Sequence, residues 1–103
     1  MKEITKGKLF QMERTYTEIL ISEEADSIIF ESCANKLTLL FGAKIINHVN
    51  DLEADYLDVE IDQEKITLHR QTFIGISIFP TDLGNATQQA NVLVEKVGRQ
   101  LKF

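Results

Sequence analysis

The chain of 103 residues carries 11 Lys and Arg against 16 Asp and Glu, a formal net charge of −5, and 44% of its residues are hydrophobic. This length and composition predict one globular domain over residues 1–103 and exclude an intrinsically disordered chain. The excess of acid argues against direct binding to nucleic acid or to a membrane surface, because contacts with phosphate need concentrated positive charge.

The first predicted element is extended. Residues 8–21 are rich in Thr, Tyr and Ile, and residues 16–21 have the composition of a strand. Residues 13–15 offer a turn, so this segment forms either one long strand or a hairpin.

A helix is predicted over residues 23–41. Ser22 is the expected N-cap, with Glu23 and Glu24 in the first turn, where carboxylates face the positive end of the helix dipole. Gly42 is the expected left-handed terminator. Apolar residues recur at helical spacing on one stripe: Ala25, Ile29, Cys33, Leu37 and Leu40, with Ile28 and Phe41 beside it.

Strands are predicted next. Residues 43–49 form a short strand, and residues 56–62 and 65–70 alternate between apolar and polar side chains. Short links between these segments and the next one predict an antiparallel meander. The side chains predicted to face inward are Leu57, Val59, Ile61, Ile66, Leu68, Ile74, Ile76 and Ile78.

Pro80 is predicted to end the sheet, and Asn85 with Gln88 resembles the capping box of a closing helix. Gly98 weakens the last turn of that helix by about 1 kcal/mol relative to Ala. Its apolar stripe consists of Ala86, Ala90, Leu93, Val97 and Leu101. The predicted fold is therefore α+β: an antiparallel sheet of four or five strands with two helices on one face, in the order β(β)-α-β-β-β-β-α.

No arrangement of residues predicts catalysis, a metal site or a cofactor. His48 and His69 are the only histidines, and with the lone Cys33 they do not supply the ligands of a zinc site. Cys33 lies on the helix stripe and is expected to pack in the core. A single cysteine, together with no apolar stretch of signal or membrane-span length, predicts a cytoplasmic protein without a membrane segment.

Seven of the carboxylates lie within residues 51–64, which contain no basic residue until Lys65. If Ile61 and Ile66 close the turn of a hairpin, Asp58 lies opposite His69 and Glu60 opposite Thr67 on the outward face. Such a pair raises the pKa of the histidine. A following loop over residues 71–73 would place His69 opposite Gly75. The predicted binding surface is an aromatic and acidic face suited to cations: Tyr56, Asp58, Glu60, His69 and Phe73. The competing interpretation is an ordinary solvated strand face with a cross-strand ion pair.

The strand-rich segments DYLDVEI (55–61), ITLH (66–69) and GISIFP (75–80) resemble small uncharacterised bacterial α+β proteins, some of which accompany toxins as immunity proteins. The resemblance covers residues 55–101, rests on the strand pattern and assigns no functional residue. It implies a bacterial protein that binds and blocks a partner.

The hypothesis from the sequence is a non-catalytic protein-interaction module, of the immunity-inhibitor type, that binds a basic protein partner; self-association is also compatible with the outward face. The alternative is a small-molecule-binding or weakly catalytic domain with a pocket between the sheet and the helices.

Overall fold

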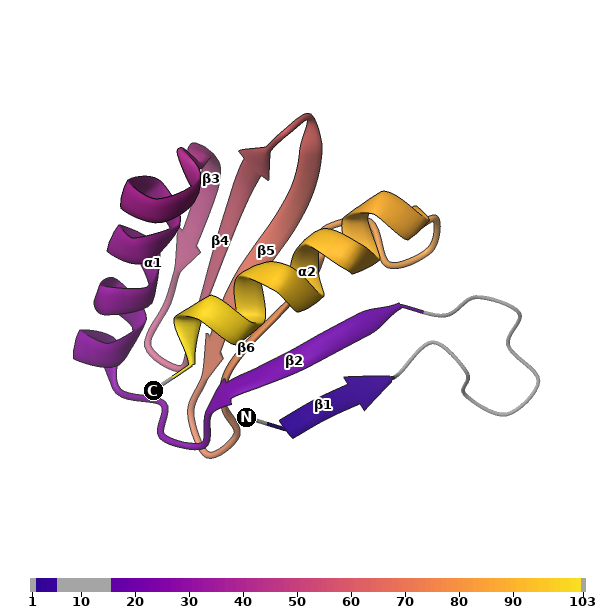
Figure 1. Cartoon of the computed structure of the whole chain (residues 1–103). Coiled ribbons are helices and arrows are strands. Elements are labelled where there is room, and N and C mark those ends of the chain that lie inside the picture. Colours follow the sequence, from indigo (N-terminus) through magenta and orange to yellow (C-terminus); the bar gives the residue numbers. More distant parts are fainter. Residues whose placement is uncertain (1, 6–15, 103) are drawn as a thin grey trace.

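The computed structural model describes residues 2–5 and 16–102, and in these residues six strands form one sheet beside two helices. The strand order is β1-β2-β6-β5-β4-β3, and every neighbouring pair is antiparallel. Figure 1 shows both helices on the same side of the sheet, so the predicted α+β class and element order are confirmed. The elements are β1 (Lys2–Thr5), β2 (Thr17–Ser22), α1 (Ser27–Phe41), β3 (Lys44–Asn50), β4 (Ala54–Ile61), β5 (Glu64–Gln71), β6 (Gly75–Pro80) and α2 (Gln88–Leu101).

The N-terminal strands form an antiparallel pair at one edge of the sheet. The strand predicted within residues 16–21 is β2, and β1 lies before the segment that was expected to be extended. The turn considered at residues 13–15 lies outside the described residues. Because β2 also pairs with β6, this hairpin joins the rest of the sheet through β2.

The core lies between the sheet and the helices, as the alternating pattern predicts. The inward side chains of β4, β5 and β6 are buried together with Ile19 and Ile21 of β2. Ile74 is the exception: it lies in the β5–β6 turn, before β6 begins, where its backbone N–H donates to the carbonyl of Gln71 and its side chain is exposed. Its assignment to the inward face was therefore wrong.

The start of α1 differs from the prediction. Asp26 is the N-cap, and its side chain accepts a hydrogen bond from the backbone N–H of Ile28 at 2.6 Å. Ser22 still belongs to β2, where it pairs with Ile76, and its hydroxyl instead accepts from the N–H of Glu24. Residues 23–26 are needed to lead the chain from the sheet to the helix layer, so the helix cannot begin at Ser22.

The buried stripe of α1 is also rotated from the predicted one. Phe30, Cys33 and Leu37 are buried, whereas Leu40 is exposed and Ala25 precedes the helix. The predicted burial of Cys33 is confirmed, and burial raises the pKa of its thiol to about 11. Gly42 ends the helix at φ 63°, in the left-handed conformation expected of it.

Helix α2 is capped by Thr87, whose hydroxyl accepts a hydrogen bond from the N–H of Ala90 at 3.0 Å. Asn85 and Ala86 lie before the helix, so the predicted capping box was wrong. Gly98 is buried, and a Cβ atom there would lie 2.9 Å from the Ile19 side chain. The glycine therefore allows α2 to pack closely on β2, a role beyond the predicted weakening of the helix.

Candidate functional site

The β4–β5 hairpin determines which outward residues meet. Its turn consists of Asp62 and Gln63, both at positive φ (52° and 70°), as a two-residue type I′ turn requires. Ile61 therefore pairs with Glu64 and not with Ile66. The predicted register is wrong by two residues, although every side chain keeps its predicted face because a shift of two preserves the alternation.

With this register, Tyr56 and not Asp58 lies opposite His69. The two rings stack with centroids 4.3 Å apart at an interplanar angle of 16°. On β6, Ser77 rather than Gly75 is the partner of His69, and the rings of His69 and Phe79 form a T-shaped contact with centroids 5.8 Å apart. Of the predicted rings, Tyr56 and His69 lie together on the outward face, in a pairing different from the predicted one.

His69 is a half-buried residue whose Nε2 has no hydrogen-bond partner in the described part of the chain. Burial lowers the pKa of His69, and the charge of Arg70 lowers it further, while Glu18 offsets part of this effect. The predicted Asp58–His69 dyad with a raised histidine pKa was therefore wrong. A neutral imidazole stacked on a tyrosine packs the sheet surface and is poorly placed to exchange protons.

Asp58 and Glu60 both face outward, as predicted, but have structural neighbours. Asp58 accepts a hydrogen bond from the Thr67 hydroxyl at 2.7 Å. Glu60 lies between Lys44 and Lys65 in the register of the sheet. Asp58 therefore supports the pairing of β4 with β5, and the cation-binding role predicted for Asp58 and Glu60 has no direct support in this arrangement.

Phe73 lies at the tip of the β5–β6 turn and not over the sheet. It is a bulky residue at φ 73° and is 97% exposed. The tip of the β3–β4 hairpin lies beside it, because the N–H of Thr72 donates to the carbonyl of Glu53 at 2.9 Å, and Leu52 on that tip is also 97% exposed. We refer to Leu52, Glu53, Phe73 and Ile74 as the tip surface.

A buried polar cluster that was not predicted from the sequence lies on the helix side of the sheet. Asp55 and Arg70 are paired across β4 and β5 and are only 4% and 8% exposed. Arg70 Nε donates to Asp55 Oδ2 at 2.6 Å, His48 Nε2 lies 3.1 Å from Oδ1, and the Asn50 amide also donates to Oδ1. The Phe30 ring stacks on His48 at 6.0 Å.

The Asp55 carboxylate is fully engaged by these partners. Burial by itself raises its pKa, but the hydrogen bonds from Asn50, Arg70 and His48 and the charge of Arg70 outweigh burial and lower the pKa below its ordinary value of 3.8. Arg70 also donates to the carbonyl of Ala25 at 3.4 Å, just before α1. Through these hydrogen bonds the cluster connects β3, β4 and β5 with the start of α1. The sequence does contain a signal for this ion pair. Asp55 and Arg70 lie in phase with the inward-facing apolar residues of their strands, and a charged side chain that faces inward needs a partner of opposite charge.

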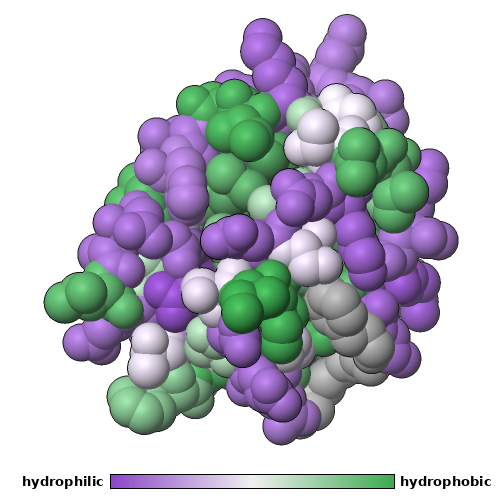
Figure 2. Space-filling model, turned by 90° about the vertical axis from the view of Figure 1, so that its left-hand side faces the viewer, coloured by the Kyte–Doolittle hydropathy of each residue, from purple (hydrophilic) through white to green (hydrophobic). Residues whose placement is uncertain are grey.

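Strand β3 is exposed along its whole length. All seven residues are exposed, among them Ile45 (57%), Ile46 (45%) and Val49 (48%). Figure 2 views the side of the molecule that carries α1 and β3, where hydrophobic side chains lie in several groups among hydrophilic ones. An exposed strand of this composition at a sheet edge is unusual for a surface that meets only water.

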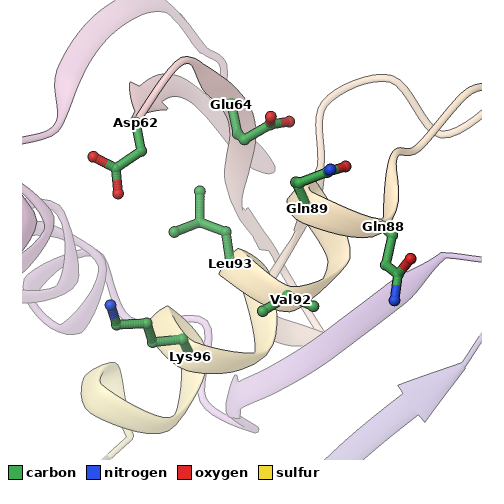
Figure 3. A pocket seen from close by; sticks show the side chains of 7 residues that line it. All are labelled: Asp62, Glu64, Gln88, Gln89, Val92, Leu93 and Lys96. Atoms are coloured by element: carbon green, nitrogen blue, oxygen red, sulfur yellow. The ribbon is translucent and has the colours of Figure 1, made fainter.

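The structure also bears on the alternative hypothesis of a pocket. An open groove of about 450 Å³ lies between the β4–β5 hairpin and α2. Figure 3 shows that its polar side chains do not converge: Asp62 and Lys96 extend to one side of Leu93, while Glu64 and Gln89 point to the other. Glu64 accepts a hydrogen bond from the Thr87 hydroxyl at 3.0 Å and so supports the start of α2. The groove lacks the convergent polar groups expected of a small-molecule site.

In residues 2–5 and 16–102, no group of three or more His, Cys, Asp and Glu side chains could hold a metal ion, and neither helix is long and apolar enough to cross a membrane. Comparisons with protein-family models, with curated proteins and with solved structures found no match.

Proposed function

We propose that the chain is a non-catalytic protein-interaction module that binds a basic protein partner through the tip surface. The surface presents two almost fully exposed apolar side chains, Leu52 and Phe73, with the exposed carboxylates of Asp51 and Glu53 on the same hairpin as Leu52. Aromatic rings and carboxylates both attract the cationic side chains of a partner.

The conformation of Phe73 is the observation that carries this proposal. A non-glycine residue in the left-handed region costs about 1–2 kcal/mol, and a side chain that is 97% exposed recovers little of this by burial. Turn residues such as Gly or Asn adopt positive φ at lower cost. A bulky ring that destabilises the turn and packs on almost nothing is best explained by contact with another molecule.

The biological form that we propose is an inhibitor of the immunity type, acting on a basic partner in the bacterial cytoplasm. Its support is the strand pattern of residues 55–101, together with the net charge of −5. Long-range attraction between opposite charges would speed association with such a partner.

The test compares the wild-type protein with Phe73→Asn as bait for the cytoplasmic proteins of the source cells. Asn tolerates positive φ, so we expect its unfolding free energy to equal the wild-type value or to exceed it by up to about 1 kcal/mol. We expect a basic protein to be retained by the wild type, released by salt, and retained at least tenfold less by Phe73→Asn. Val92→Ala, which truncates an exposed apolar residue on α2, is the matched control and should retain the partner.

Equal retention by Phe73→Asn and the wild type would exclude the tip surface as the binding site. A Phe73→Asn protein that is clearly less stable than the wild type would show that the ring has a structural role, and would remove the argument from strain.

A further inference from the structure

The edge of the sheet at β3 has no strand partner within the described residues. β3 is the last strand in the sheet order and pairs only with β4. Its outer edge therefore presents backbone N–H and C=O groups that another strand can pair with. All seven of its side chains are exposed.

Proteins usually protect such an edge with charges, proline, a bulge or a very short strand. β3 has one charged residue, Lys44 at its start, and a bulge where the register shifts between Ile45 and Asn47. Beyond the bulge the register is continuous from Asn47 to Asn50, and no charge or proline interrupts it. This part of the edge is open to pairing.

We propose that β3 pairs antiparallel with β3 of a second copy of this chain, about a two-fold axis. An axis at His48 places Asn47 of each copy opposite Val49 of the other on the outward face. The charges at the two ends of the strand are also complementary, because antiparallel pairing brings Lys44 of one copy towards Asp51 of the other. The two six-stranded sheets would then join into one sheet of twelve strands.

The edge carries exposed apolar side chains, Ile45 and Val49, that pairing with a second copy would partly cover. In the register with β4, Ile45 lies on the helix side of the sheet beside Val59, and Val49 lies on the outward side beside Tyr56. With the axis at His48, Val49 lies next to it on the outward face, beside Asn47 of the other copy, and Ile45 lies three residues from it on the helix side. This inference is independent of the tip surface, which contains no residue of β3.

The test measures the solution mass by light scattering after size exclusion and by sedimentation over a range of concentrations. We expect the wild type to approach twice 11.7 kDa at high concentration. The double variant Asn47→Lys with Val49→Lys should stay at the mass of one chain, because it places like charges beside each other across the axis. Its control, Gln89→Lys with Val92→Lys, adds the same charge to exposed positions on α2 and should dimerise as the wild type does.

A cysteine scan tests the geometry without depending on added charge. Asn47 of one copy and Val49 of the other lie opposite each other across the proposed axis, so the double variant Asn47→Cys with Val49→Cys should form an intermolecular disulfide under mild oxidation. The control Gln89→Cys with Val92→Cys should not, and the buried Cys33 should not react in either protein. A wild type that stays at the mass of one chain at every concentration would overturn the dimer. So would a dimer that the β3 variants leave unchanged. Phe73→Asn should still dimerise, so loss of partner binding and loss of the dimer are separate outcomes.

Discussion

The Asp55 cluster supports the sharpest prediction about stability. Replacing Asp55 with Asn keeps the shape of the side chain but removes the charge that faces Arg70, which is 2.6 Å away and 8% exposed. Removing one partner of a buried ion pair leaves the other charge uncompensated and typically costs about 3–5 kcal/mol. The Asn side chain retains an oxygen that can accept a hydrogen bond. We therefore expect Asp55→Asn to lower the free energy of unfolding by about 3 kcal/mol, the lower end of this range. This is a large fraction of the roughly 5–15 kcal/mol that stabilises a domain.

The same cluster predicts how the stability lost in Asp55→Asn depends on pH. The pKa of Asp55 is lower in the folded protein than its ordinary value of 3.8. A depressed carboxyl pKa contributes stability that is fully present above pH 3.8 and is lost as the pH falls through the folded-state value. The difference in unfolding free energy between the wild type and Asp55→Asn should therefore be constant near neutral pH and shrink in acid.

Urea unfolding followed by circular dichroism, at neutral pH and at several acidic pH values, measures both effects. Glu53→Gln is the matched control, since it removes one exposed carboxylate near the same strand and should change stability by less than about 0.5 kcal/mol. If Asp55→Asn is as stable as this control, or if the difference does not shrink on acidification, the buried pair does not stabilise the fold as described.

Two further predictions concern packing. Gly98→Ala should lower the melting temperature although Ala is the better helix former. The added Cβ would lie 2.9 Å from Ile19, and overpacking costs about 1–3 kcal/mol. A higher melting temperature would show that α2 and β2 can move apart. Cys33 should react with a thiol reagent only as the protein unfolds, since it is buried and its pKa is raised to about 11; rapid labelling of the native protein would contradict this.

The features predicted correctly from the sequence are those that local periodicity sets. Alternation along β4 and β5 placed Leu57 and Leu68 in the core, and helical spacing placed Cys33 there. The steric freedom of glycine located the end of α1 at Gly42. These properties depend on neighbours along the chain, so the α+β class and the element order followed from them.

Which residues meet across the strands depends on the register of the folded sheet and could not be predicted from the sequence. The alternation has a period of two, so it cannot distinguish a register in which Asp58 faces His69 from one in which Tyr56 does. The turn that decides between them uses Asp62 and Gln63 at positive φ, without the glycine that marks such a turn in most sequences. The partnership of Asp55 with Arg70 depends on that register, and the exposure of β3 depends on its place at the sheet edge, which its neighbours in the sequence do not encode.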